Sequence, residues 1–168
     1  MDSSYITPFV RSTQNVFETM LQLPVQVGEP VIKRAGEPSY DVSGIIGMSG
    51  DVEGATVLSF PTATAERVVS LFTGVELAHT HEDFADAVGE LVNMISGGAK
   101  AQFPDAHVSI SCPSVVIGND HIVVSGKDTR CIVIPCSCDC GDFAVEVSFR
   151  QIAASAASNG QTKAQATA

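Results

Sequence analysis

The segment of residues 81–103 constrains the fold more than any other part of the chain, because it carries two stripes of side chains with helical spacing. The first stripe is apolar and consists of Phe84, Val88, Leu91 and Ile95. The second is polar, ends in a glycine, and consists of Asp86, Glu90, Asn93 and Gly97. At about 100° per residue, the two stripes point roughly 200° apart on a helix. We therefore predict a long amphipathic helix that buries the first stripe and displays the second.

The other apolar patterns predict helices and strands in a fixed order around this helix. Proline and glycine mark most of the boundaries between them. The predicted elements are a helix over residues 4–23, a hairpin over 40–60, a helix over 62–74, and strands over 107–112, 115–118, 121–124, 131–134 and 143–149. The order helix, strands, helix, helix, strands predicts an α+β domain in which long helices pack on one antiparallel sheet.

The chain also contains an internal echo. A helix with Glu18 precedes strands that end at Phe60-Pro61, and a helix with Glu90 precedes strands that end at Ile134-Pro135. We expect a pseudo-two-fold duplication within one domain, residues 1–150. Residues 151–168 consist mostly of Ala, Ser, Gln and Thr without a periodic apolar face, so we predict a low-complexity C-terminal tail.

Charge and hydropathy argue against several classes of protein. The formal net charge of −10 does not suit nucleic acid or anionic membrane surfaces, which bind patches of Lys and Arg. It suits a partner with a basic rim, or one that carries a metal ion. No apolar run reaches about 18 residues, and the N-terminus lacks the basic and apolar regions of a secretory signal. We therefore expect a cytoplasmic protein that neither crosses a membrane nor binds nucleic acid.

The cysteines form a second candidate site. Cys136, Cys138 and Cys140 alternate along the chain, with Cys131 nearby. Thiolates at this spacing can bind Zn²⁺ if a turn brings them together. On a strand, however, neighbours on the same face lie about 6.8 Å apart, too far to share one ion without a bend. Buried or turn cysteines are therefore the favoured interpretation, and a metal or redox site is the alternative.

The polar stripe resembles the helix motif of the CheC/CheX/FliY phosphatases of bacterial chemotaxis. In that family an acidic or Ser residue is followed after three residues by Glu, after two more by Asn, and later by Pro. Asp86, Glu90 and Asn93 match in register, and Gly97 lies where CheX-type members tend to have Gly. Further segments resemble CheX members in the same order: residues 17–20, 43–51, 113–118, 134–135 and 146–149.

Two features depart from the family pattern. The stretch from Asn93 to Pro113 is shorter than usual, so no role is carried over to Pro113. In the first helix, Gln14 and Glu18 have the spacing of the motif, but Leu21 stands where two-site members carry Asn. The resemblance therefore implies one site, as in the CheX type.

The resemblance implies a phosphatase that hydrolyses the aspartyl phosphate of a phosphorylated CheY-like response regulator, in chemotaxis or related two-component signalling. Asn93 would orient the attacking water, Glu90 would pair with the regulator's active-site Lys, Asp86 would help docking, and Gly97 would permit close approach. It also implies a possible homodimer joined through sheet edges. No metal or cofactor is expected on this chain, since Mg²⁺ would be bound by the regulator.

Three other interpretations stay open at this stage. Carboxylates and amides on a helix also describe an ordinary solvated face. The same fold can serve as a non-catalytic module that binds a response regulator or a flagellar-switch partner. The cysteines, finally, allow a thiol-metal sensor.

Overall fold

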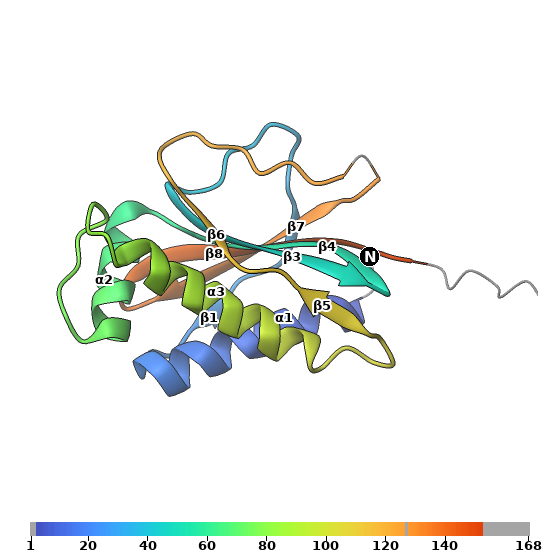
Figure 1. Cartoon of the computed structure of the whole chain (residues 1–168), viewed down its shortest axis with the longest axis horizontal. Helices are drawn as coiled ribbons and strands as arrows, with labels where there is room; N and C mark the ends of the chain where they lie inside the picture. The colour runs from blue at the N-terminus through green and yellow to red at the C-terminus, as the bar shows by residue number, and fades with distance from the viewer. Residues whose placement is uncertain (1–2, 127, 153–168) are drawn as a thin grey trace, which may run out of the picture.

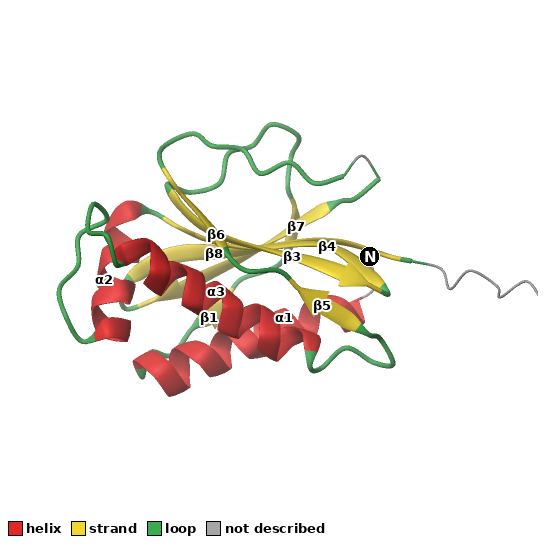
Figure 2. Ribbon diagram, viewed as in Figure 1, coloured by secondary structure: helices red, strands yellow, loops and turns green. Residues whose placement is uncertain are grey.

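The computed structural model describes residues 3–126 and 128–152. Within these residues, three α-helices pack on one face of an eight-stranded antiparallel sheet, which confirms the predicted α+β class (Figures 1 and 2). The elements are α1 (Ser3–Val16), the π-helical turn η1 (Phe17–Leu21), β1 (Gln26–Val27), β2 (Val31–Ile32), β3 (Val42–Gly50), β4 (Val52–Phe60), α2 (Thr62–Thr73), α3 (Phe84–Lys100), β5 (Val108–Ile110), β6 (Ser114–Ile117), β7 (Cys131–Cys138) and β8 (Gly141–Gln151).

The strand order supports the predicted internal duplication. The sheet runs β1-β7-β8-β4-β3-β5, with β2 also paired to β7 and β6 also paired to β3. The strands of the two halves correspond in pairs: β1 and β2 to β5 and β6, β3 to β7, and β4 to β8. If each strand is replaced by its counterpart, the sheet order becomes β5-β3-β4-β8-β7-β1, which is the original order in reverse. Under this exchange α1 corresponds to α3, and these two helices pack against each other. The two halves meet where β4 pairs with β8.

The core lies between the helices and the sheet. The predicted apolar stripe of α3 (Phe84, Val88, Leu91 and Ile95) is fully buried there. Aromatic rings connect the first helix to the sheet: the rings of Phe17 and Phe143 stack with centroids 4.7 Å apart, and Phe60 lies 5.3 Å from Phe143. Burial of this apolar area supplies most of the driving force for folding.

A buried ion pair fastens the loop after β2 to the opposite face of the sheet. Lys33 Nζ lies 2.7 Å from Glu146 Oε2, and the two side chains are only 6% and 4% exposed. Ser39 Oγ completes the group, because it donates to Glu146 Oε1 at 2.9 Å and accepts from Lys33 Nζ at 2.8 Å. Each charge is thus compensated in a place from which water is largely excluded.

One predicted helix boundary and one predicted strand are wrong. The third helix begins at Phe84 rather than at residue 81, because residues 81–83 form a turn in which the His81 ring accepts a hydrogen bond from the Asp83 N–H. Residues 121–124 do not form a strand. This segment is held instead by a backbone bond from Ser39 N to His121 O and by the His121 ring, which lies 2.8 Å from both Gly118 O and Ser43 Oγ.

The first helix also ends differently from the prediction. Its last turn is wound as the π-helix η1, which places Leu21 in the core and leaves Met20 46% exposed. A regular 3.6-residue period would place Met20 on the same face as Phe9 and Val16, which are buried. Gln22, with φ of 54°, then reverses the chain before Pro24.

The C-terminal strand extends one residue past the predicted end of the domain. Gln151 pairs with Val52, and its side-chain amide donates to the Tyr5 hydroxyl. The rest of the predicted tail, apart from Ile152, lies outside the described residues. No helix in residues 3–126 and 128–152 is long and apolar enough to cross a membrane.

Candidate functional site on helix α3

Helix α3 is held in place by two close backbone approaches. Gly44 of β3 leaves room for Val88 and Val92, since a Cβ at this glycine would lie 2.9 Å from a Val92 methyl group. Gly98 does the same for α1, where Ser12 Oγ donates to Ile95 O at 2.7 Å. The helix therefore packs firmly against both the sheet and α1, as a site on a rigid element requires.

The predicted polar stripe forms the solvent-facing strip of this helix. Asp86 and Glu90 are exposed, whereas Asn93 and Gly97 are half-buried. Their neighbours on either side are buried, including Ala87, Gly89, Val92 and Ser96, so the strip is narrow. Within the described part of the chain, no residue forms a hydrogen bond or ion pair with the side chains of Asp86, Glu90 or Asn93. These polar groups are thus available to a partner.

Pro113 lies beside this strip, a placement that the sequence did not reveal. A Cβ on Gly89 would lie 3.1 Å from Pro113 Cγ, so the helix and the segment before β6 are in close contact. Together with Asp86, Glu90 and Val115 they line a shallow hollow of about 430 Å³. The shorter spacing to Pro113 had put a role for this proline in doubt. The one available signal was Gly89 itself, since a glycine inside a helix often marks a close approach.

Gly97 and Gly98 are adjacent in sequence but have different surroundings. A Cβ on Gly97 would meet no heavy atom within 4 Å, whereas a Cβ on Gly98 would meet Ser12 Oγ. Gly98 is therefore needed for packing inside the protein. At Gly97 the helix backbone has no side chain over it and open space beside it, which is compatible with the predicted close approach of a partner.

The corresponding position on the first helix cannot offer the same chemistry. Glu18 is exposed like Glu90, but Leu21, in the place of Asn93, is only 7% exposed. Gln14 is engaged with the chain itself, as its amide donates to Val25 O at 3.4 Å. Both the residue type and the π-helical winding thus agree with a single polar strip on α3.

The cysteines do not converge on a metal site in the described residues, where no group of three or more His, Cys, Asp or Glu side chains could hold an ion. Cys136 and Cys140 are buried, and Cys138 Sγ lies 3.6 Å from Gly141 O in the turn between β7 and β8. Burial raises the pKa of Cys136 to about 12 and that of Cys140 to about 11, so both are protonated thiols at neutral pH. This agrees with the favoured interpretation of buried and turn cysteines.

Comparisons with known proteins match both the fold and the sequence. Residues 42–137 match the family described as chemotaxis phosphatase CheX. The CheY-P phosphatase CheX of Thermotoga maritima is 31% identical over 123 residues, which cover 71% of this chain and 79% of that protein.

Solved structures agree with this match. A CheC-like superfamily protein from Shewanella sp. PV-4 is 31% identical, with a TM-score of 0.81 over 89% of this chain and 99% of that one. A CheX-CheY-BeF3-Mg²⁺ complex from Borrelia burgdorferi contains a chain with the same fold, 24% identical, with a TM-score of 0.69 over 88% of this chain and 98% of that one.

In the described residues, three helices pack on one antiparallel sheet whose strand order is repeated internally, and α3 displays a strip with an acid and an amide. Together these features define a protein of the CheC-like fold class. The resemblance read from the sequence is thereby confirmed. The chain belongs to the chemotaxis phosphatase CheX family.

Proposed function

We propose that this protein hydrolyses the aspartyl phosphate of a phosphorylated CheY-like response regulator, using Glu90 and Asn93 on α3. The observation that carries the proposal is the polar strip of α3, where the exposed Glu90 and the half-buried Asn93 lie one helical turn apart on a firmly packed helix. Neither side chain forms a hydrogen bond or ion pair with any residue that the structure describes. Family membership and the name of the Thermotoga relative, a CheY-P phosphatase, support the same activity.

The chemistry requires little from this chain beyond positioning. In an acyl phosphate, water attacks phosphorus in line, the bond from phosphorus to the Asp oxygen breaks, and the carboxylate leaves. The regulator would supply the Mg²⁺ and the Lys that neutralise the phosphoryl oxygens. The Borrelia complex, in which a CheX is bound to CheY with BeF3 and Mg²⁺, is consistent with that division of labour. What remains is to hold a water molecule in line with the breaking bond.

Asn93 suits the task of orienting that water. Its amide both donates and accepts hydrogen bonds and does not titrate, so it can orient a water over a wide pH range. A misplacement of the reacting groups by about 1 Å can cost about 10²-fold in rate, so we expect a loss of about this size when the amide that positions the water is removed. Its half-buried setting limits the directions that the amide can take, which favours one orientation of the water.

Glu90 suits a docking role. An exposed carboxylate at the edge of the hollow beside Pro113 can form a charge-assisted pair with the regulator's Lys and fix the register of the complex. Asp86, one turn earlier, would add to the attraction, and Gly97 would let the regulator approach the helix backbone. No cofactor on this chain enters the mechanism.

The setting of the reaction is part of the proposal. We expect chemotaxis or related two-component signalling in the cytoplasm, where response regulators act. A homodimer would be joined through sheet edges, since strand edges that are left open attract further strands. Within the described residues β6 pairs only with β3, so its outer edge is available for this contact.

The experiment is phosphate release from a panel of phosphorylated regulators, with wild type and single variants side by side. Asn93→Ala should lose about 10²-fold in rate while keeping most of its affinity. Asn119→Ala, an exposed amide in a loop outside the site, is the matched control and should behave as wild type. A protein that binds phosphorylated regulators without shortening the lifetime of any of them would instead be the non-catalytic module.

Glu90→Lys separates docking from chemistry. It places a like charge against the regulator's Lys and should weaken association more than Asn93→Ala does. Glu29→Lys, with the same charge change at another exposed position, controls for the long-range effect of net charge. Equal affinity for wild type and Glu90→Lys would refute the docking role.

A further inference from the structure

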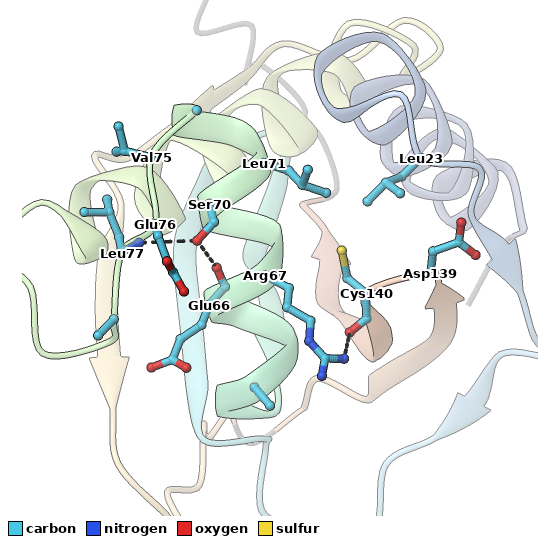
Figure 3. A pocket seen from close by; sticks show the side chains of 13 residues that line it. Leu23, Glu66, Arg67, Ser70, Leu71, Val75, Glu76, Leu77, Asp139 and Cys140 are labelled. Atoms are coloured by element: carbon cyan, nitrogen blue, oxygen red, sulfur yellow. Dashed lines mark hydrogen bonds between the residues drawn. The ribbon is translucent and has the colours of Figure 1, made fainter.

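A second surface of the molecule has the features of a docking groove. An open groove of about 1040 Å³ runs along the outer face of α2 and shares no lining residue with the hollow beside Glu90. Figure 3 shows α2 as its floor, the segment with Val75 and Leu77 on one side, and Leu23, Asp139 and Cys140 on the other.

Apolar side chains in this groove are left without cover. Leu71 is 51% exposed and Val75 is 57% exposed, although both are large aliphatic residues. Leu23 and Leu77, which lie on opposite sides of the groove, are buried and form part of its walls. Exposed aliphatic side chains that line a concave surface are typical of protein interaction sites.

The rim of the groove is acidic. Glu76 and Asp139 line it, as does Glu66, whose carboxylate is bonded to His79 at 2.7 Å, and Arg67 is the single cation among the lining residues. Arg67 is also tied down, because its Nη1 donates to Cys140 O at 3.4 Å, as Figure 3 shows. The groove therefore has exposed aliphatic side chains between carboxylates. Such a surface complements a ligand whose apolar face is flanked by Lys or Arg.

These features select one class of occupant. A second copy of this acidic chain would bring like charges together, and an anionic lipid surface would be repelled by the same carboxylates. The groove follows the 12 residues of α2, about 18 Å of helix, which matches an extended ligand better than a compact one. We propose that the α2 groove binds an amphipathic helix of a partner protein, with aliphatic side chains on Leu71 and Val75 and Lys or Arg against Glu76 and Asp139.

Binding of a synthetic helix tests this proposal. The probe is a fluorescein-labelled peptide of about 15 residues with Leu at i, i+3, i+4 and i+7 and Lys on both borders of that stripe. A matched peptide has Glu in place of every Lys. Fluorescence anisotropy should give binding of the Lys peptide to the whole protein at least about tenfold tighter than binding of the Glu peptide.

Matched variants locate the site. Leu71→Ser/Val75→Ser should weaken binding of the Lys peptide about tenfold or more, whereas Ile122→Ser/Val124→Ser, which removes aliphatic groups exposed elsewhere, should not. Glu76→Lys/Asp139→Lys should weaken it similarly, and the charge-matched Glu29→Lys/Glu37→Lys should weaken it far less. The proposal is overturned if the Lys peptide does not bind, if the two peptides bind equally, or if the groove variants and the control variants weaken binding of the Lys peptide equally. It is also overturned if analytical sedimentation shows that the protein self-associates and that substitution of Leu71 abolishes the self-association.

Loss of phosphatase activity would leave this proposal intact, because the groove and the α3 strip share no residue. Asn93→Ala should bind the Lys peptide as wild type does, and Leu71→Ser/Val75→Ser should release phosphate at the wild-type rate. Weaker binding of the Lys peptide to Asn93→Ala than to wild type would place the peptide on α3 rather than α2, and would overturn the proposal.

Discussion

The neighbouring glycines 97 and 98 allow a sharp test of how α3 is built. Alanine at either position should stabilise an exposed helix by about 0.5–1 kcal/mol, because glycine loses more conformational entropy on folding. A Cβ on Gly97 meets nothing within 4 Å, so Gly97→Ala should realise that gain. A Cβ on Gly98 lies in contact with Ser12 Oγ, whose hydroxyl would have to turn away from Ile95 O.

The magnitude for Gly98→Ala follows from the bond that is lost. Ser12 is only 3% exposed, so a hydroxyl turned from its acceptor is left buried without a partner, at a cost of about 1–3 kcal/mol. The gain in helix propensity offsets part of this cost, and the two alanine variants should differ by about 1–3 kcal/mol in free energy of unfolding. Urea denaturation followed by circular dichroism measures the difference.

A double-mutant cycle isolates the cause. In a Ser12→Ala background the hydroxyl is absent, so Gly98→Ala should become neutral or stabilising, and the coupling between the two sites should be about 1 kcal/mol or more. Equal stability of Gly97→Ala and Gly98→Ala in the wild-type background would refute this account of the packing between α1 and α3. Gly97→Ala should at the same time weaken association with the phosphorylated regulator, although it folds more stably.

Three further predictions concern other parts of the fold. Lys33→Met leaves Glu146 buried without its cation and should destabilise the protein by about 3–5 kcal/mol in urea, much of which Lys33→Met/Glu146→Leu should restore. Hydrogen bonds from His79 hold the pKa of Glu66 below its ordinary value of 4.5, so the stability that these bonds contribute is complete above pH 4.5 and is lost as the pH falls below it. In thermal melts, His79→Ala should therefore lose less stability than wild type over that pH range. An acid profile of the melting temperature that is the same as that of wild type would contradict the assignment. Leu21→Asn should lower stability by about 2–5 kcal/mol without adding a second phosphatase site, because this position is buried; a gain in phosphate release would show the reasoning wrong.

The amphipathic helix was the most predictable element, because both of its stripes depend on a local 3.6-residue period. That period correctly predicted that Phe84 and Ile95 are buried and that Asp86 and Glu90 are exposed. It failed for Met20, where the π-helical turn shifts the register of the side chains. Local pattern alone does not reveal such a turn, since the packing of Phe17 on Phe143 in a distant strand accompanies it.

The remaining errors have a similar origin in long-range structure. Residues 121–124 have the composition of a strand, yet they form none, and His121 is bonded instead to Ser39 and Ser43, which are far away in sequence. Pro113 lies beside Glu90 only because β6 pairs with β3 underneath α3, a contact between segments far apart in sequence. The roles of Glu90 and Asn93 came from the family resemblance, since the residues themselves also fit an ordinary solvated face.

The lifetime of a phosphorylated CheY-like regulator in the presence of saturating protein tests the central claim most directly. Wild type should shorten that lifetime, and Asn93→Ala at the same saturation should lengthen it again by about 10²-fold relative to wild type, with Asn119→Ala unchanged. A lifetime that is equally short with wild type and Asn93→Ala would contradict the role of the α3 amide in orienting the attacking water.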